Sequence, residues 1–142
     1  MVLLDVNVLV YAHREDTPQH QDYHHWLRQL CHAQQPFGLS DIVLSGFIRI
    51  VTHQKVFKTP STIEEAVAFT EELREAPNCA LIHPGVRHWE IFCNLCRRAG
   101  VKGNLVPDAF LAALAIESGS EWITADRDFH RFPGLHVRHP LG

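Results

Sequence analysis

The chain begins with a short apolar run that ends in an aspartate, and this run constrains the fold more than any other stretch. Residues 2–4 are Val-Leu-Leu, Asp5 follows, and apolar residues resume directly after it. Burying a carboxylate in such surroundings is unfavourable unless something compensates its charge. The neighbouring residues give Asp5 no obvious structural use. In an open α/β sheet, ligands and metals gather at the carboxyl ends of the strands. The pattern therefore predicts a first strand that places Asp5 in a ligand site.

The rest of the chain alternates short strands with helices. Besides the first strand, residues 79–82, 121–124 and 135–138 are predicted to be strands, and Pro36 and Gly38 are interpreted as a chain break. Strands alternating with helices are typical of a mostly parallel sheet covered by helices, which is an α/β fold. At this length we expect one domain, residues 1–142, with no linker, repeat or low-complexity segment.

Local signals predict where the helices begin and end. Thr17 followed by Pro18 indicates a helix start, and Ser40 is predicted to cap another helix. Ser61 with Glu64 resembles a capping box and predicts a helix that continues to about residue 74. A further helix is expected over residues 85–98, closed by Gly100. Residues 106–116 are apolar around most of a helix circumference and predict a buried central helix.

Three aspartates occur at comparable places. Asp5 ends the first strand, Asp126 follows a later strand, and Asp108 lies in the first turn of the buried helix, where unpaired backbone N–H groups favour an anion. Converging carboxylates repel one another and raise each other's pKa unless a cation is present. Mg²⁺ takes oxygen ligands and suits phosphoryl chemistry. Taken singly, Asp108 also fits an ordinary helix start and Asp126 a solvated turn.

Composition and charge exclude some classes of protein. The formal net charge of −3 argues against a broad electrostatic grip on nucleic acid, although a local basic patch remains compatible with it. No apolar stretch is long enough to span a bilayer, and the start of the chain does not resemble a secretory signal. The four cysteines are interpreted as reduced thiols of a cytoplasmic protein.

Three segments carry a resemblance to a known family. Leu-Asp-Val-Asn-Val-Leu (4–9), Gly-Asn-Leu-Val-Pro-Asp-Ala (103–109) and Thr-Ala-Asp-Arg-Asp-Phe (124–129) resemble the PIN-domain ribonucleases. In particular the chain is similar to the VapC-type toxins of bacterial type II toxin–antitoxin pairs. The similarity also covers Phe-Ile-Arg-Ile-Val-Thr (47–52) and the closing Phe-Pro-Gly-Leu (132–135), and therefore nearly the whole chain.

The resemblance implies a fold, an activity and a set of site residues. The fold would be a three-layer α/β/α sandwich, and the activity would be Mg²⁺-dependent endoribonuclease cleavage by metal-activated water, with Mn²⁺ as a substitute, leaving a 5′-phosphate and a 3′-hydroxyl. By motif match, Asp5, Asp108 and Asp126 would be the catalytic, metal-binding acids. Asp128 would be an additional metal-binding acid, and Asn7 and Thr124 would orient the acids through hydrogen bonds.

The resemblance also implies partners: a VapB-type antitoxin, an RNA substrate and a second copy of the chain in a homodimer. One departure from the family stands out. Many PIN domains carry a glutamate in the helix near residue 46, where this chain has Gly46, and Asp41 is the nearest acid. The departure leaves the number of metal ions open. It also leaves open a degenerate PIN domain that binds RNA or a protein without cutting.

Other kinds of site fit the sequence less well. A haloacid-dehalogenase phosphatase needs an acid at position 7, where this chain has Asn7, and a response-regulator receiver needs a late strand-end lysine that is missing. Cys93 and Cys96 have zinc-like spacing but no second pair. The histidines at 20, 24 and 25 fit a polar surface better than a metal site. The candidate contacts to RNA are cationic: Arg49, Arg97, Arg98 and Lys102.

Overall fold

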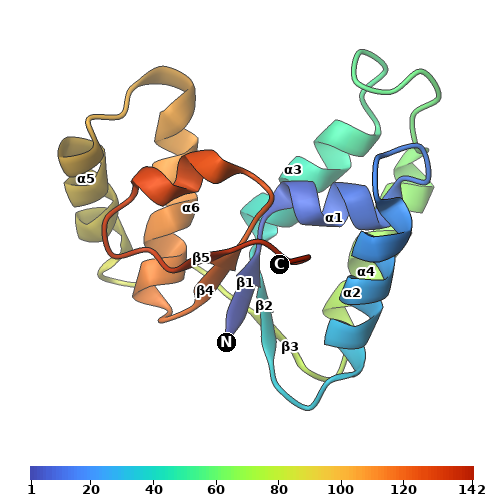
Figure 1. Ribbon diagram of the computed structural model, residues 1–142, viewed down its shortest axis with the longest axis horizontal. Helices are drawn as coiled ribbons and strands as arrows, with labels where there is room; N and C mark the ends of the chain where they lie inside the picture. Colours follow the sequence, from blue (N-terminus) through green and yellow to red (C-terminus); the bar gives the residue numbers. More distant parts are fainter.

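A five-stranded parallel sheet forms the middle layer of the molecule (Figure 1). The computed structural model describes residues 1–142, and its strands lie in the order β3-β2-β1-β4-β5. Every neighbouring pair is parallel. The strands are β1 (Val2–Leu4), β2 (Phe37–Leu39), β3 (Cys79–Leu81), β4 (Glu121–Ile123) and β5 (Val137–Arg138).

Helices cover both faces of this sheet, so the predicted three-layer α/β/α sandwich is confirmed (Figure 1). One layer contains α1 (Val6–His13), α2 (His20–His32), α3 (Asp41–Val51) and α4 (Ile63–Arg74). The other contains α5 (His88–Ala99) and α6 (Val106–Glu117), joined by the short helix η1 (Gly103–Leu105). A second short helix, η2 (Arg127–Arg131), follows β4. No helix is both long and apolar enough to cross a membrane.

The buried helix predicted from the apolar run is α6. Ala109 and all five residues from 111 to 115 are buried, which explains why apolar residues extend around most of its circumference. Trp122 and Ile123 of β4 are also fully buried. Because β4 lies inside the sheet and is covered by helices on both faces, two successive residues are apolar rather than alternating with polar ones.

Strand β2 was missed in the sequence, because Pro36 and Gly38 were interpreted as a break. The interpretation was wrong. A Cβ atom at Gly38 would lie 3.0 Å from Ile82 Cγ1 and 3.1 Å from Leu3 Cδ1, so the strand needs glycine for close packing. Glycine in a strand often marks such an approach of neighbouring groups rather than a turn.

Two predicted helix starts were displaced along the chain. Thr17 does not cap α2, because its hydroxyl donates to the Arg14 carbonyl over 2.6 Å and α2 begins only at His20. The capping box belongs to Thr62 and Glu65, whose side chains bond each other's backbone N–H over 3.1 and 3.0 Å. The hydroxyl of Ser61, which the prediction used, instead contacts side chains of α1 and its C-cap residue.

Helix α5 begins three residues later than predicted. The Gly85 and Arg87 N–H groups donate to the Glu117 carboxylate over 2.7 and 2.9 Å, which holds this stretch as a turn before the helix. The predicted end is confirmed, because Gly100 closes α5 with a φ of 61°. A left-handed backbone of this kind is favourable for glycine and strained for other residues.

The strand order has one reversal, and it lies between β1 and β4. The chain proceeds from β1 through β2 to β3 at one edge, and then crosses the sheet to β4 on the other side of β1. In open α/β sheets, the strand ends beside such a reversal diverge and form a ligand crevice. The Asp5 N–H donates to the Ile123 carbonyl over 3.0 Å, which brings the carboxyl ends of these two strands together.

Candidate active site

Asp5 lies at the carboxyl end of β1 and caps helix α1. Its Oδ1 accepts a hydrogen bond from the Val6 N–H over 2.7 Å, and the residue is only 5% exposed. The expectation that Asp5 has no structural use is therefore corrected, because a cap satisfies one of the unpaired N–H groups of the helix. The second carboxylate oxygen, Oδ2, takes no part in the cap.

A hydrogen-bond network from β4 and α1 holds that second oxygen. The Thr124 hydroxyl donates to Asp5 Oδ2 over 2.6 Å, and Asn7 Nδ2 lies 3.2 Å from the same oxygen. Asn7 Nδ2 is also 3.1 Å from Thr124 Oγ1, and Asn7 Oδ1 accepts from the Ala125 N–H over 3.1 Å. Asn7 and Thr124 thus fix the Asp5 carboxylate, which is the arrangement that the resemblance implies for them.

The same threonine positions Asp126. The Asp126 N–H donates to Thr124 Oγ1 over 3.0 Å, and the Asp126 carboxylate caps η2 by accepting from the Asp128 N–H over 2.9 Å. Asp128 itself is exposed. One buried hydroxyl therefore links the carboxylate that follows β1 to the backbone that carries Asp126.

Asp108 comes to the crevice from a different element. It lies in the first turn of α6 after Pro107 and is partly buried. Burial raises the pKa of Asp108, and the nearby charges of Asp126 and Asp128 raise it further, whereas Arg131 lowers it. The sequence therefore brings acids from three separate segments into electrostatic contact.

The pKa of Asp5 is raised to about 6. Burial is the largest cause, the negative charges of Asp108 and Asp126 add to it, and the hydrogen bonds from Thr124 and Val6 oppose it. A carboxylate that is costly to ionise and surrounded by like charges is typical of a site that holds a cation.

The donor set fits a hard divalent cation, but the acids do not enclose one. No group of three or more histidine, cysteine, aspartate or glutamate side chains is gathered closely enough to hold a metal ion. Mg²⁺ usually takes one or two carboxylates and keeps several waters, so a closed protein cage is not required. The oxygen donors and the raised pKa values of Asp5 and Asp108 are consistent with such an open site.

The place of the family's helix glutamate is filled differently here. A Cβ atom at Gly46 would lie 3.2 Å from Val6 Cγ2, so Val6 occupies the space beside this part of α3. Asp41 does not replace the missing acid, because its carboxylate forms an exposed ion pair with Arg74 at 2.8 Å.

Arg131 was missed in the sequence. Its Nε donates to the Asp128 carbonyl over 3.0 Å, and its Nη2 lies 3.6 Å from Asp128 Oδ1. Its positive charge also lowers the pKa of Asp108. The three-residue spacing between Asp128 and Arg131 was the available signal, since such a spacing places two side chains on one side of a helical turn.

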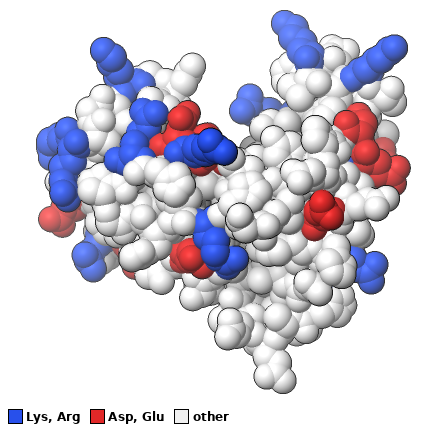
Figure 2. Space-filling model, in the orientation of Figure 1, with Lys and Arg blue, Asp and Glu red and all other residues white.

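The cations predicted to contact RNA are exposed and make no ion pair. Arg97 and Arg98 lie in the last turn of α5, Lys102 precedes η1, and Arg49 lies in the last turn of α3. Figure 2 shows Lys and Arg side chains on both lobes of the molecule, on either side of a notch, with acidic atoms in the wall of that notch.

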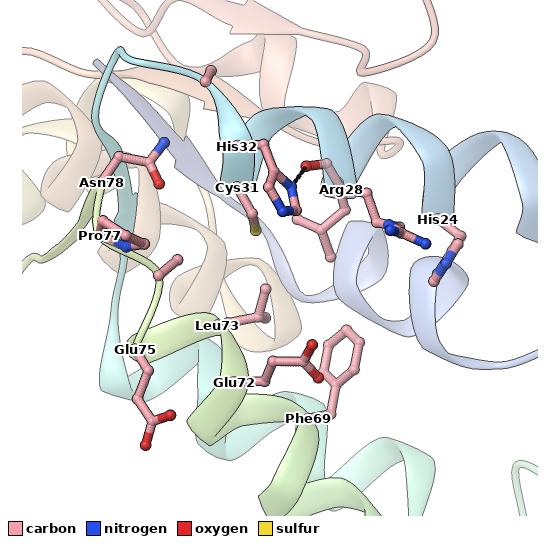
Figure 3. Close-up of a pocket in the computed structure, with 13 residues that line it drawn as sticks. His24, Arg28, Cys31, His32, Phe69, Glu72, Leu73, Glu75, Pro77 and Asn78 are labelled. Carbon is pink, nitrogen blue, oxygen red and sulfur yellow. Dashed lines mark hydrogen bonds between the residues drawn. The ribbon is translucent and has the colours of Figure 1, made fainter.

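The remaining candidate groups lie outside this site. Cys93 and Cys96 are free thiols, and the ring nitrogens of His20 and His24 contact the carbonyls of Tyr11 and Ala12. A cavity of about 900 Å³ lies between α2 and α4. Figure 3 shows it bordered by α2 side chains such as His24 and Arg28 and by α4 side chains such as Phe69 and Glu72. It contains none of the candidate acids.

Comparisons with known proteins agree with this architecture. Residues 2–135 match the model of the PIN domain family. Ribonuclease VapC43 from Mycobacterium tuberculosis is 45% identical over 141 residues, which are 99% of this chain and 96% of the relative. Ribonuclease VapC31 from the same organism is 40% identical over 142 residues, which are 99% of this chain and 100% of the relative.

Solved structures share the fold at lower identity. VapBC2 from Rickettsia felis, bound to a DNA fragment from its promoter, is 21% identical and superposes with a TM-score of 0.71 over 98% of each chain. VapC20 from Mycobacterium tuberculosis, a sarcin-ricin loop cleaving toxin, is 14% identical with a TM-score of 0.67, covering 95% of this chain and 98% of that one. From the matched family and these relatives, the chain belongs to the PIN-domain family, within its VapC group.

Proposed function

We propose that this protein is a metal-dependent endoribonuclease and the toxic component of a VapBC-type toxin–antitoxin pair. The observation that carries the proposal is the network in which Thr124 joins Asp5 to the backbone of Asp126 at the strand-order reversal. The network holds two acids in fixed positions at the crevice where a ligand would bind. The curated relatives at 40–45% identity are named ribonucleases, which supports the same activity.

Asp5, Asp108 and Asp126 are the residues that would hold Mg²⁺ or Mn²⁺, with Asp128 as an additional acid. A divalent ion of this kind supplies polarisation of the phosphodiester and a water of lowered pKa. The chain contributes the orientation of the acids. Asn7 and Thr124 fix the Asp5 carboxylate, and Thr124 also fixes the Asp126 backbone. We propose that exposed cations on the two lobes bind the RNA backbone. They include Arg49, Arg97, Arg98 and Lys102.

A VapB-type antitoxin is the protein partner that we propose. The structure from Rickettsia felis is that of a VapBC complex, and its VapC fold covers this chain almost completely. Occupation of the notch by such a partner would compete with RNA, and the free protein is therefore the form in which cleavage has to be measured.

We also propose that the protein forms a homodimer through an apolar face near Asp108. An apolar groove of about 330 Å³ lies between the start of α3 and helices α5 and α6. Trp89 is 66% exposed beside it, with its ring 5.2 Å from that of Phe92. Ile42 and Pro107 of the groove are exposed, as is Trp89, and the other groove residues are partly exposed or buried. An apolar groove flanked by exposed apolar side chains often marks an interface. The face consists of Ile42, Trp89, Phe92, Val106, Pro107, Phe110 and Leu111.

The experiment that tests the activity is incubation of total RNA with the purified, antitoxin-free protein in Mg²⁺ or Mn²⁺. Parallel reactions contain EDTA or the Asp5→Asn variant, which keeps the shape of the side chain and removes its charge. Cleavage at a few discrete sites that is lost in EDTA and in the variant supports the proposal and identifies the substrate. Cleavage that persists in Asp5→Asn contradicts the assignment of Asp5.

The alternative is a PIN domain that binds RNA or a protein without cutting. Two observations favour it: Gly46 stands where many PIN domains carry a glutamate, and no closed group of metal ligands is formed. Absence of cutting with any metal, combined with retained RNA binding, would establish this alternative and exclude the enzyme.

A further inference from the structure

The segment from His53 to Pro60, here called the basic loop, joins α3 to α4 without regular secondary structure. In Figure 1 it is the green loop that rises above the end of α3. It carries Lys55 and Lys58, and Val56 between them is 55% exposed.

The base of the basic loop is clamped by Arg14, which follows α1. The guanidinium donates to the Thr59 carbonyl over 2.8 Å and to Ser61 Oγ over 3.2 Å, and it lies 4.2 Å from the centre of the Phe57 ring. Asp16 completes the clamp with a 2.6 Å ion pair. The Arg14 side chain is only 11% exposed. An arginine that is nearly buried and contacts two loop residues and the serine that follows the loop is a structural anchor rather than a solvated charge.

Hydrogen bonds within the loop give it a defined shape. The N–H groups of Val56 and Phe57 both donate to the His53 carbonyl, over 3.0 and 3.1 Å, and the Lys55 N–H donates to His53 Nδ1 over 3.1 Å. Just beyond the loop, the Ser61 N–H donates to the Val51 carbonyl at the end of α3 over 2.8 Å. The backbone at the tip is therefore held in place while the side chains at the tip remain free.

The two lysines have no partner within the protein. Lys55 and Lys58 are exposed and form neither an ion pair nor a side-chain hydrogen bond. Two acids of the neighbouring segments are engaged elsewhere, since Asp16 pairs with Arg14 and Glu65 caps α4. A rigid loop that presents unpaired cations is prepared for an anionic partner.

The basic loop stands on the opposite side of the notch from η2 and the end of α5. Figure 2 shows Lys or Arg side chains over this loop on one lobe and a larger group of them over the other lobe. A polyanionic strand that reaches an acidic site must be attracted from the rim, because the acids themselves repel it. Cations on only one rim would leave the strand free to turn away from the acids.

We propose that the basic loop is the second wall of the RNA-binding notch. Lys55 and Lys58 contact backbone phosphates of the single strand, and Arg14 is a positioning residue that holds the loop in the conformation that makes these contacts. The inference rests on the proposed function, and it assigns to that function a phosphate-binding arm that acts before any bond is cut.

The test is RNA binding by a protein that cannot cut. In the Asp5→Asn background, a short fluorescein-labelled single-stranded RNA of mixed sequence is titrated with protein at several salt concentrations. We expect Lys55→Gln/Lys58→Gln to weaken binding about tenfold at low salt, and to lower the slope of log K against log salt by about 1.4, since each phosphate contact on a single strand contributes about 0.7.

The matched control is Arg28→Gln/Arg87→Gln, which also removes two exposed cations but leaves both rims of the notch intact. Its salt slope should stay at the parent value. An equal loss of slope in both double variants would overturn the inference, because only net charge would then matter. Unchanged RNA affinity in Lys55→Gln/Lys58→Gln would also overturn the inference. The same holds if this variant keeps its RNA affinity but loses antitoxin binding, because the loop would then bind the protein partner and not RNA.

The role of Arg14 has its own readout. Arg14→Met should weaken RNA binding and increase hydrogen exchange at the Ser61 amide, whose N–H donates to the Val51 carbonyl beside the Arg14 contact. In the Lys55→Gln/Lys58→Gln background this substitution should have no further effect on RNA affinity. A purely structural role would add to the lysine effect, and additivity would overturn the positioning assignment. Cleavage by the wild-type protein is scored separately, so failure of the nuclease and failure of the loop proposal give different results.

Discussion

The Thr124 hydroxyl donates a 2.6 Å hydrogen bond to Asp5 Oδ2, joining two residues that are 119 positions apart in the sequence. Thr124 Oγ1 also accepts a hydrogen bond from the Asp126 N–H over 3.0 Å. Thr124 is 2% exposed, so no water replaces it easily. One side chain therefore links the carboxyl ends of β1 and β4, which the strand pairing already brings together, and connects two of the three acids.

Thr124→Val should impair the site while keeping a side chain of nearly the same shape at position 124. The variant removes the donor to Asp5 and the acceptor for the Asp126 N–H, and we expect metal-dependent kcat/KM to fall about 10- to 100-fold, as for other residues that orient metal ligands. Thr124→Ser keeps the hydroxyl and should retain most activity. If the valine variant cleaves RNA as fast as the serine variant, the orienting role is wrong.

Asp5 should make the metal-free fold less stable as the pH rises. Its pKa is about 6 in the folded protein and 3.8 in the unfolded chain. Between these values the folded state binds more protons than the unfolded state, so stability is greatest at low pH and is lost as the pH rises through 6. In EDTA we expect a loss of about 1 to 2 kcal/mol between about pH 5 and about pH 8 from this group.

The measurement is urea unfolding in EDTA for the wild type and Asp5→Asn at both pH values, and the comparison is the difference between them. The variant has no titrating group at this position, so the difference should change with pH and should shrink when Mg²⁺ is added. A difference that is the same at both pH values would contradict the raised pKa.

The candidate acids could be predicted from the sequence because the signal for each one lies in the residues directly around it. Asp5, Asp108 and Asp126 each lie in a short motif, and strand ends and helix starts can be predicted from the neighbouring residues. The contacts between segments could not be predicted. The capping role of Asp5 depends on where α1 begins, and the Arg131 contacts depend on the turn geometry of η2.

The errors in the fold have the same origin. Gly38 was interpreted as a break because its packing partners, Leu3 and Ile82, are far away in the sequence. The capping box was displaced by one residue because the Ser61 hydroxyl is occupied by His13 and Arg14 from another element. In each case a contact with a distant segment decided the local structure, and the neighbouring residues alone could not show it.

Arg131→Met should lower activity most at acid pH. The guanidinium lies beside Asp128 and lowers the pKa of Asp108, so its loss raises that pKa and leaves less ionised Asp108 at a given pH. We expect a fall in kcat/KM of about tenfold on the acid side, the size of one lost contact to a charged group. Arg131→Lys keeps the charge and should follow the wild-type pH profile, and an unchanged profile in Arg131→Met would remove Arg131 from the site.

Trp89→Glu should convert the proposed homodimer to a monomer. Trp89 is 66% exposed in the single chain and touches only the rim of the apolar groove, so its replacement should leave the fold of the monomer nearly unchanged. In a dimer the new carboxylate would be buried against the partner without a counter-charge, which strongly opposes association. Light scattering after size-exclusion chromatography measures the mass directly.

Ile63→Glu is the matched control, because Ile63 is 55% exposed on α4, away from this face, and its variant should keep the mass of the wild type. If the wild type is already a monomer, or if both variants remain dimers, the apolar face is not the interface.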